Sequence, residues 1–344
     1  MSFIFALLGF GLLIVVHEFG HYIMAIFSKM RVDRFSVGFG PTIMRGKKNN
    51  TSFELALIPL GGFVQIAGMN PQEEFSPDDM SNYHNRPAYQ RFLTILFGPL
   101  MNFFGAVILF FVFFYFFFSV PLAPVKVSEV LENTPAQKAG IIKGDMITAI
   151  DEKPLSTFVS FFNVIQAAPN SPLYLTVKRN DGLHHFVVIP YNADGVGKIG
   201  VKVEPSAYSD DEISFKDAVL GSFEQVGIVS LNILKSLKQM VSGSESVQLS
   251  GPIGIFDSLQ EQVRQDTGAG FRALGVLSVA LGLFNLLPIP ALDGSRLMFL
   301  AVELISRRKV NRKIEHWIHF SGFVMLLGLM IVITFGDIAR LIEK

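Results

Sequence analysis

The chain has 344 residues, of which 50% are hydrophobic and 34 are phenylalanine, and its mean hydropathy is +0.43. This composition excludes an ordinary soluble protein and predicts a membrane protein. The formal net charge of +0 gives no indication of nucleic-acid binding. Because there is no cysteine, disulfides, thiolate metal sites and cysteine nucleophiles are excluded, and metal ligands must be His, Asp or Glu.

Residues 1–28 are predicted to form an uncleaved first transmembrane helix, which contains the sequence His-Glu-Phe-Gly-His. On a helix, His17 and His21 lie one above the other on one face, so both imidazoles can reach one ion. This H-E-x-x-H pattern predicts a Zn²⁺ site at which Glu18 takes a proton from a water molecule. The flanking residues are uncharged, and ionisable groups inside a membrane are costly, which favours a functional role.

Residues 29–91 are expected to be a β-rich region that is cytoplasmic or re-enters the membrane. Its flexible positions are Gly38, Phe39 and Gly40 at the end of one strand, and Gly61 and Gly62 between two others. Taken alone, such a stretch indicates an ordinary extramembrane hairpin. The alternative is an apolar β-element beside the H-E-x-x-H site that offers a strand edge to an extended substrate.

Residues 92–120 carry no charge and are predicted to be the second transmembrane helix. Asn102 is its one strongly polar side chain, and it either makes an interhelical hydrogen bond or supports the metal site. Residues 124–204 are polar and alternate short strands, and residues 133–147 resemble the PDZ signature of bacterial proteases, a short helix followed by a G-D-x-I turn. We expect one PDZ domain here, which either binds peptide C-termini by strand addition or serves as a spacer.

Residues 205–270 are interpreted as amphipathic periplasmic helices, and residues 271–293 as the third transmembrane helix. Pro288 and Pro290 close that segment, and they break the backbone because proline cannot continue a helix. Broken backbone at membrane depth must lie against protein or a cavity. Asp293 follows the break and is either a cap or salt-bridge partner of the next helix, or a third zinc ligand.

The distribution of Lys and Arg along the chain helps to decide between these two roles of Asp293. The region 29–91 and the basic loop 294–315, which precedes the fourth transmembrane helix at 316–338, are both rich in Lys and Arg and are therefore expected on the cytoplasmic face. The PDZ domain and both termini then lie outside. Asp293 falls at the same end of its helix toward which His17 and His21 are displaced, and this agreement favours the ligand role.

The motifs together resemble the site-2 protease family, specifically the bacterial regulator-of-sigma-factor type. The resemblance covers nearly the whole chain and rests on H-E-x-x-H at 17–21, F-S-V-G-F-G-P at 35–41, I-P-L-G-G-F-V at 58–64, F-G-P-L-M-N-F at 97–103, S-G-P-I at 250–253 and N-L-L-P-I-P-A-L-D-G at 285–294. It implies a polytopic α-helical membrane protein with four transmembrane helices, a membrane-associated β-hairpin region and one inserted PDZ domain. The better-known members carry two PDZ domains, and Ser295-Arg296 replaces an expected Gly-His.

The resemblance also implies one Zn²⁺ per chain, held by His17, His21 and Asp293, with Glu18 as general base. Asn285 would hold the substrate backbone or polarise its carbonyl, and the residues beside the substrate would be Gly38, Phe39, Gly40, Gly61 and Gly62. Asn102, Pro288 and Pro290 are expected to support the site.

The expected function is zinc-dependent intramembrane cleavage of single-span membrane proteins, either anti-sigma factors or signal-peptide remnants, in the bacterial inner membrane. The active site would lie toward the cytoplasm, and the partners would be these substrates, the lipid bilayer and peptide C-termini, without nucleic acid. The alternative is a catalytically inactive PDZ-bearing membrane scaffold. A metal transporter is disfavoured, because the apolar segments offer few polar groups for an ion path.

Overall fold

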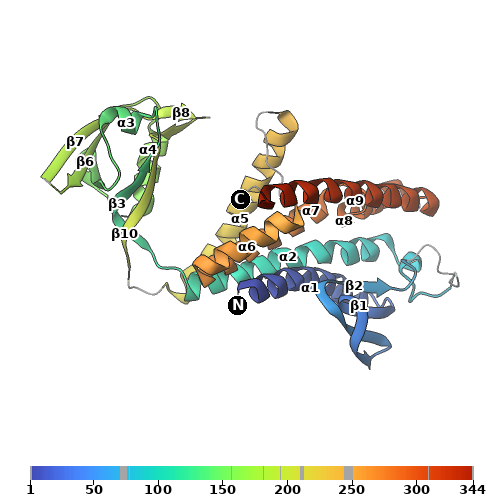
Figure 1. Ribbon diagram of the computed structural model, residues 1–344. Helices are drawn as coiled ribbons and strands as arrows, with labels where there is room; N and C mark the ends of the chain where they lie inside the picture. The colour runs from blue at the N-terminus through green and yellow to red at the C-terminus, as the bar shows by residue number, and fades with distance from the viewer. Residues whose placement is uncertain are drawn as a thin grey trace. The chain divides into compact units, whose positions relative to one another are not determined.

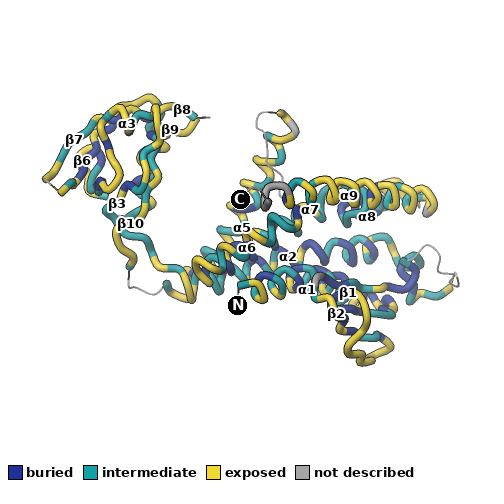
Figure 2. Tube along the Cα trace, viewed as in Figure 1, coloured by how far each residue is buried: buried dark blue, intermediate teal, exposed yellow. Residues whose placement is uncertain are grey.

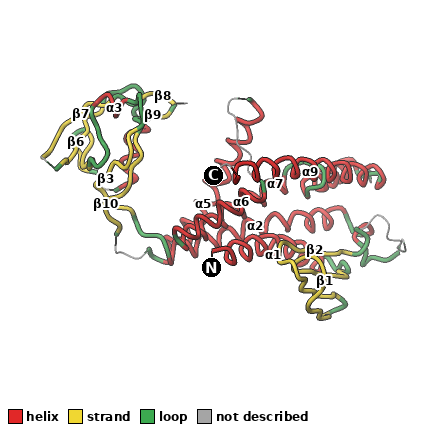
Figure 3. Tube along the Cα trace, viewed as in Figure 1, coloured by secondary structure: helices red, strands yellow, loops and turns green. Residues whose placement is uncertain are grey.

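The computed structural model describes residues 2–342 apart from 70–75, 77, 156, 181, 194, 210–212, 244–250 and 309. Ser250 of the S-G-P-I motif therefore lies outside the described residues. The chain divides into a helical unit, Met1–Phe117 with Ser214–Lys344, and a β-rich unit, Phe118–Ile213 (Figure 1). In Figure 3 the β-rich unit carries most of the strands, while the helical unit contains long helices and one curled hairpin.

Four described helices are long and apolar enough to cross a membrane, which confirms the prediction of four such segments. They are α1 (Ser2–Phe27), α2 (Ala88–Phe116), α7 (Thr267–Leu286) and α9 (Arg312–Ile342). Helix α2 begins four residues before the expected span. The prediction followed the uncharged run, and that run begins only after Arg91 in the first turn of the helix. Arg91 in that turn is buried and pairs with Glu303 of the helix that precedes α9.

The segment that follows α7 differs from the expected basic loop. Helix α7 ends at Leu286, residues 287–292 are irregular as the two prolines predict, and α8 (Asp293–Ser306) begins directly afterwards. The N-terminal part of the expected loop 294–315 is therefore helical. Its Leu297 and Leu300, three residues apart on one helix face, are buried in the same core cluster as Ile95 of α2.

Helix α2 is the centre of the helical unit and contacts α1, α7, α8 and α5 (Phe215–Ser242). Phe110 of α2 is buried together with Val229 of α5 and Val279 of α7. Helix α6 (Pro252–Gln265) packs against α1, α7 and α9. Figure 2 shows buried residues along α1 and α2, whereas α9 is largely exposed, as an apolar helix in contact with lipid would be. A position of α5 and α6 at the membrane interface stays a prediction.

The hairpin of the helical unit folds back on itself. Its strands β1 (Val32–Lys48) and β2 (Thr51–Ile66) are antiparallel, and Phe35 pairs with both Phe53 and Val64. The first half of β1 therefore lies between the two halves of β2. The bends fall at Gly38, Gly40 and Gly61, whose φ values of +88°, +90° and +117° favour glycine. A short 3₁₀ turn, η1 (Tyr83–Asn85), precedes α2.

The β-rich unit has a main antiparallel sheet in the order β10-β3-β4-β6-β7, with β5 paired to β4. The strands are β3 (Pro121–Val130), β4 (Met146–Ile150), β5 (Lys153–Pro154), β6 (Leu173–Arg179), β7 (Gly182–Val188) and β10 (Val201–Tyr208). The pair β8 (Tyr191–Ala193) and β9 (Val196–Lys198) and the helices α3 (Pro135–Ala139) and α4 (Phe158–Ala167) complete it. Val127, Ile147 and Leu175 are fully buried in its core.

Asp145, in the predicted G-D-x-I turn, is buried and ties this turn to β6. Its carboxylate accepts hydrogen bonds of 2.7 and 2.8 Å from Arg179 and one of 2.9 Å from the backbone N–H of Ile142. Burial raises the pKa of the Asp145 carboxyl, but these hydrogen bonds outweigh burial and keep the pKa below its ordinary value. The ionised carboxylate therefore stabilises the β-rich unit at neutral pH, and this contribution is lost only in acid.

Candidate metal centre

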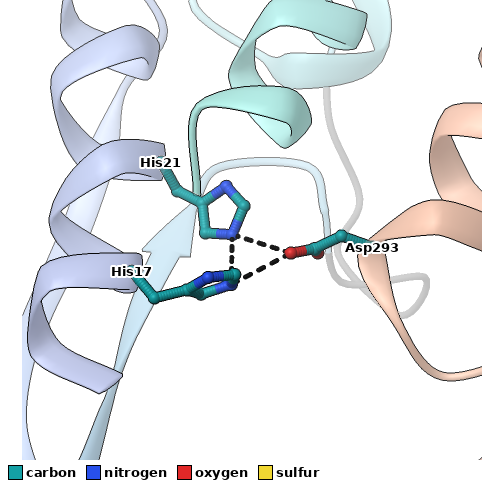
Figure 4. A group of neighbouring side chains, drawn as sticks. All are labelled: His17, His21 and Asp293. Carbon is teal, nitrogen blue, oxygen red and sulfur yellow. Dashed lines mark hydrogen bonds and ion pairs between the residues drawn. The ribbon is translucent and has the colours of Figure 1, made fainter. Parts of the chain in front are cut away.

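Three side chains of the helical unit converge on one point (Figure 4). His17 and His21 lie one turn apart on α1 and are buried, and Asp293 is the first residue of α8. The Nε2 atoms of His17 and His21 lie 3.0 and 3.2 Å from Oδ2 of Asp293, and 3.1 Å from each other. Asp293 is at the first helical position and not at the N-cap, which is Leu292.

The triangle of donor atoms has the dimensions of a zinc site. Zinc binds imidazole nitrogen and carboxylate oxygen at roughly 2.0–2.2 Å, so two ligands of a tetrahedral site are about 3.3 Å apart. The observed separations of 3.0–3.2 Å are close to this value. Two imidazoles and one carboxylate also form a donor set that leaves a fourth position for water. The residues therefore fit the zinc ion that the sequence predicts.

His21 is held from behind by α2. Its Nδ1–H donates a 2.8 Å hydrogen bond to the backbone carbonyl of Thr94, which leaves the lone pair of Nε2 facing Asp293. The ring lies against Gly98, where a methyl group would come within 2.3 Å of its Cε1 and Nε2 atoms. Gly98 thus provides the space in which the His21 ring lies, a role that its place in the F-G-P-L-M-N-F motif did not reveal. The Thr94 contact is made by the backbone, so no side-chain pattern could have predicted it.

Glu18 lies between this cluster and the hairpin. Its Oε2 atom accepts a 3.0 Å hydrogen bond from the backbone N–H of Val64 in β2. This N–H joins the sheet to α1, so the last part of β2 presents its edge to the helix that carries both histidines. The contact was not predicted, because every non-proline residue has the same backbone donor.

The other predicted site residues fall into two groups. Asn102 is fully buried, and its Nδ2 atom lies 3.3 Å from Nδ1 of His17, so the structure brings it to the cluster. Asn285 is in the last turn of α7, is half-buried, and makes no side-chain hydrogen bond with the described residues. Pro288 and Pro290 lie in the irregular segment before Asp293.

Of the predicted hairpin residues, Gly61 and Gly62 lie beside α1, whereas Gly38 and Gly40 lie against Ile58 within the hairpin. A methyl group at Gly62 would come within 3.7 Å of a Val15 side-chain carbon of α1, and Gly61 is buried against Phe39. Phe39 is 46% exposed, and its ring stacks on Phe63 with centroids 6.4 Å apart. Gly38 and Gly40 form the bend next to Phe39.

Apolar helices that bury a His-His-Asp cluster next to a glutamate define a membrane metalloprotease. The chain belongs to peptidase family M50, whose model matches residues 5–329. This confirms the predictions of a site-2 protease and of a zinc metalloprotease.

The relatives agree with this assignment. A putative zinc metalloprotease of Clostridium perfringens is 33% identical over 341 residues, which cover 98% of each chain. The regulator of sigma-W protease RasP of Bacillus subtilis is 28% identical over 415 residues, which cover 96% of this chain and 97% of the relative. Among solved structures, the PDZ domain of an SdrC-like protein from Listeria monocytogenes is similar with 21% identity and a TM-score of 0.23, covering 25% of this chain and 93% of that domain.

Proposed function

We propose that this protein is an intramembrane endopeptidase that cleaves the transmembrane segments of single-span membrane proteins. In this proposal His17, His21 and Asp293 hold one Zn²⁺ and Glu18 is the general base. The observation that carries the proposal is the convergence of three buried donor atoms within 3.0–3.2 Å of one another, next to Glu18, among apolar helices of membrane length.

The proposed chemistry is general acid–base catalysis by Glu18. When bound, zinc would lower the pKa of a ligated water toward ~7 and polarise the scissile carbonyl. Glu18 takes the proton of the attacking water and passes it to the leaving amine. Its hydrogen bond to the Val64 N–H fixes the carboxylate beside the ligands, so that little reorganisation is needed.

A transmembrane substrate must unwind locally, because the peptide bonds of a helix are already hydrogen-bonded and covered. We propose that the edge of β2 near Val64 binds the unwound segment as an added strand, with Phe39 and the bend at Gly38 and Gly40 beside it. Asn285 would then hold a substrate carbonyl, and its side-chain amide is available for this role because it makes no hydrogen bond with the described residues.

We propose that the β-rich unit is one PDZ domain that lies outside the inner membrane, as do both termini, with the active site toward the cytoplasm. Its size, its antiparallel sheet and its two helices support this assignment. In this position it would screen substrates, either by binding peptide C-termini or by excluding large outer domains. The relative named regulator of sigma-W protease suggests an anti-sigma factor as substrate, with signal-peptide remnants as the other candidate class.

The test is Glu18→Gln, compared with Glu129→Gln, an exposed carboxylate of the β-rich unit that pairs with Lys202. Zinc content and cleavage of a reporter transmembrane helix are measured on purified protein in lipid. We expect Glu18→Gln to retain zinc and to lose cleavage by roughly 10³-fold or more, because the proton acceptor is missing, while Glu129→Gln behaves as wild type. Cleavage retained by Glu18→Gln would remove the general-base role. Wild-type protein without zinc or cleavage would favour the inactive scaffold.

A further inference from the structure

Asn102 lies on the far side of the His17 ring from Asp293. Its side chain is 0% exposed, and its Nδ2 atom is 3.3 Å from Nδ1 of His17. The Oδ1 atom of the same amide is buried without a hydrogen-bond partner among the described residues. A fully buried amide with an unsatisfied oxygen is costly, so its neighbours should explain why it is there.

The two nitrogens of His17 have different surroundings. Nε2 is the atom that faces Asp293 and His21, so it is the atom that would bind the metal. Binding requires the Nε2 lone pair, and a neutral imidazole then carries its proton on Nδ1. That proton points toward Asn102 and needs an acceptor. His21 meets the same requirement with the backbone carbonyl of Thr94.

An amide side chain can supply the acceptor. The oxygen and nitrogen of Asn102 exchange places when the amide turns by half a rotation, and the two atoms are nearly equivalent in shape. When Oδ1 of Asn102 is turned toward Nδ1 of His17, this oxygen gains the hydrogen-bond donor that it lacks, and the Nδ1 proton of His17 gains an acceptor. The reverse orientation requires the proton on Nε2, which prevents metal binding.

We propose that Asn102 is a positioning residue for His17: its Oδ1 atom accepts the Nδ1–H and fixes the tautomer and ring orientation that leave Nε2 free for zinc. The inference rests on the proposed role of His17 as a ligand. Substitution of a residue that hydrogen-bonds to a metal-bound histidine typically lowers metal affinity or activity by about 10–100-fold.

Helix α7 offers a matched control at the same level. Ser278 is fully buried, and its hydroxyl donates a 2.7 Å hydrogen bond to the backbone carbonyl of Asn102. Ser278→Ala therefore removes a buried hydrogen bond of the same residue without touching the contact between the Asn102 amide and His17.

The experiment measures zinc affinity by competition with a chromophoric chelator for wild type, Asn102→Leu, Asn102→Asp and Ser278→Ala. We expect Asn102→Leu to bind zinc about 10–100-fold more weakly, because the Nδ1–H loses its acceptor. Asn102→Asp should bind at least as tightly as wild type, because a carboxylate is a stronger acceptor. Ser278→Ala should stay within about threefold of wild type, since a neutral hydrogen bond remote from the ring is lost.

A spectroscopic measurement keeps the inference testable if Asn102→Leu does not fold. In zinc-loaded wild type labelled with ¹⁵N-histidine, the Nδ1–H of His17 should exchange slowly with water, as should that of His21. The His17 signal should persist in Ser278→Ala and broaden or vanish in Asn102→Leu, while the His21 signal persists in both. A His17 proton on Nε2 in loaded wild type would overturn the inference, and so would equal zinc losses in Asn102→Leu and Ser278→Ala. Wild type without zinc would instead refute the proposed ligand role of His17.

Discussion

At the scale of residues, the site depends on small side chains as much as on the polar ones. Gly20 of α1 faces the backbone carbonyl of Phe97 so closely that a methyl group would come within 2.2 Å of it. Gly98 of α2 leaves the space that the His21 ring fills. The two helices can therefore approach until the Thr94 carbonyl reaches Nδ1 of His21. Small residues that let helices approach closely are common in membranes, and here they also fix a metal ligand.

This predicts that Gly98→Ala weakens zinc binding by roughly tenfold or more, because the new methyl group must displace the His21 ring. The measurement is zinc affinity by chelator competition. Gly105→Ala in the same helix is the control, since a methyl group there is no closer than 3.4 Å to its neighbours. Alanine is favoured over glycine by about 1 kcal/mol inside a helix, so the control should be at least as stable as wild type. Equal zinc affinities for the two variants would contradict the steric role of Gly98.

At the scale of elements, the irregular segment 287–292 determines where Asp293 lies. The segment connects α7 to α8, and Gly294 packs against the backbone of Leu286 and Leu287. Helix α9 lies against it, because a methyl group at Gly322 would come within 2.2 Å of Cβ of Pro290. The fourth apolar helix thus supports the turn that carries the only carboxylate of the cluster, although α9 itself contributes no donor atom to it.

Gly322→Ala should therefore push the 287–292 segment and move Asp293 relative to the histidines. We expect about a tenfold loss of zinc affinity, a typical result of disturbing the surroundings of a ligand. The matched substitution is Gly328→Ala in the same helix, where a methyl group has no neighbour within 4 Å. If Gly322→Ala and Gly328→Ala bind zinc equally well, α9 does not hold the segment in place.

At the scale of the whole molecule, the metal centre brings together two parts of the chain that are far apart in the sequence. His17 and His21 come from α1 and Asp293 from α8, and α2 packs against both of these helices. The cluster exists only when the helical unit is assembled, so an ion that binds there stabilises the assembled state over the unfolded one.

Removal of zinc should lower the thermal stability of the helical unit. At a free zinc concentration of 100 times Kd the bound ion contributes about 2.7 kcal/mol, which a strong chelator removes. Helix loss on heating in detergent is followed by circular dichroism, with and without the chelator. Wild type and Asp33→Asn, which changes an exposed carboxylate paired with Arg31, should both lose stability. The thermal stability of Asp293→Asn should not change when the chelator is added. If Asp293→Asn loses as much stability as wild type, the stabilising ion binds elsewhere.

Much of the candidate site could be predicted from the sequence because the helix has a fixed period. Four residues are close to one turn, so His17 and His21 must share a face wherever the helix lies. The long apolar runs likewise predicted four helices of membrane length, and the two prolines predicted the break after α7. The helical nature of α8 was missed because Arg296 and the basic residues from Arg307 to Lys313 led us to interpret the whole segment 294–315 as a loop, although the apolar residues between them form the helix.

The sequence by itself thus determined the class of chemistry, since H-E-x-x-H is a local pattern whose geometry the helix imposes. Only the tertiary structure decided what surrounds it. The Thr94 carbonyl and the Val64 N–H are backbone groups that every non-proline residue carries, and so they leave no mark in the sequence. The approach of Asp293, the room at Gly98 and the contact of Asn102 with His17 depend on how α1, α2 and α8 pack, which is a property of the assembled unit.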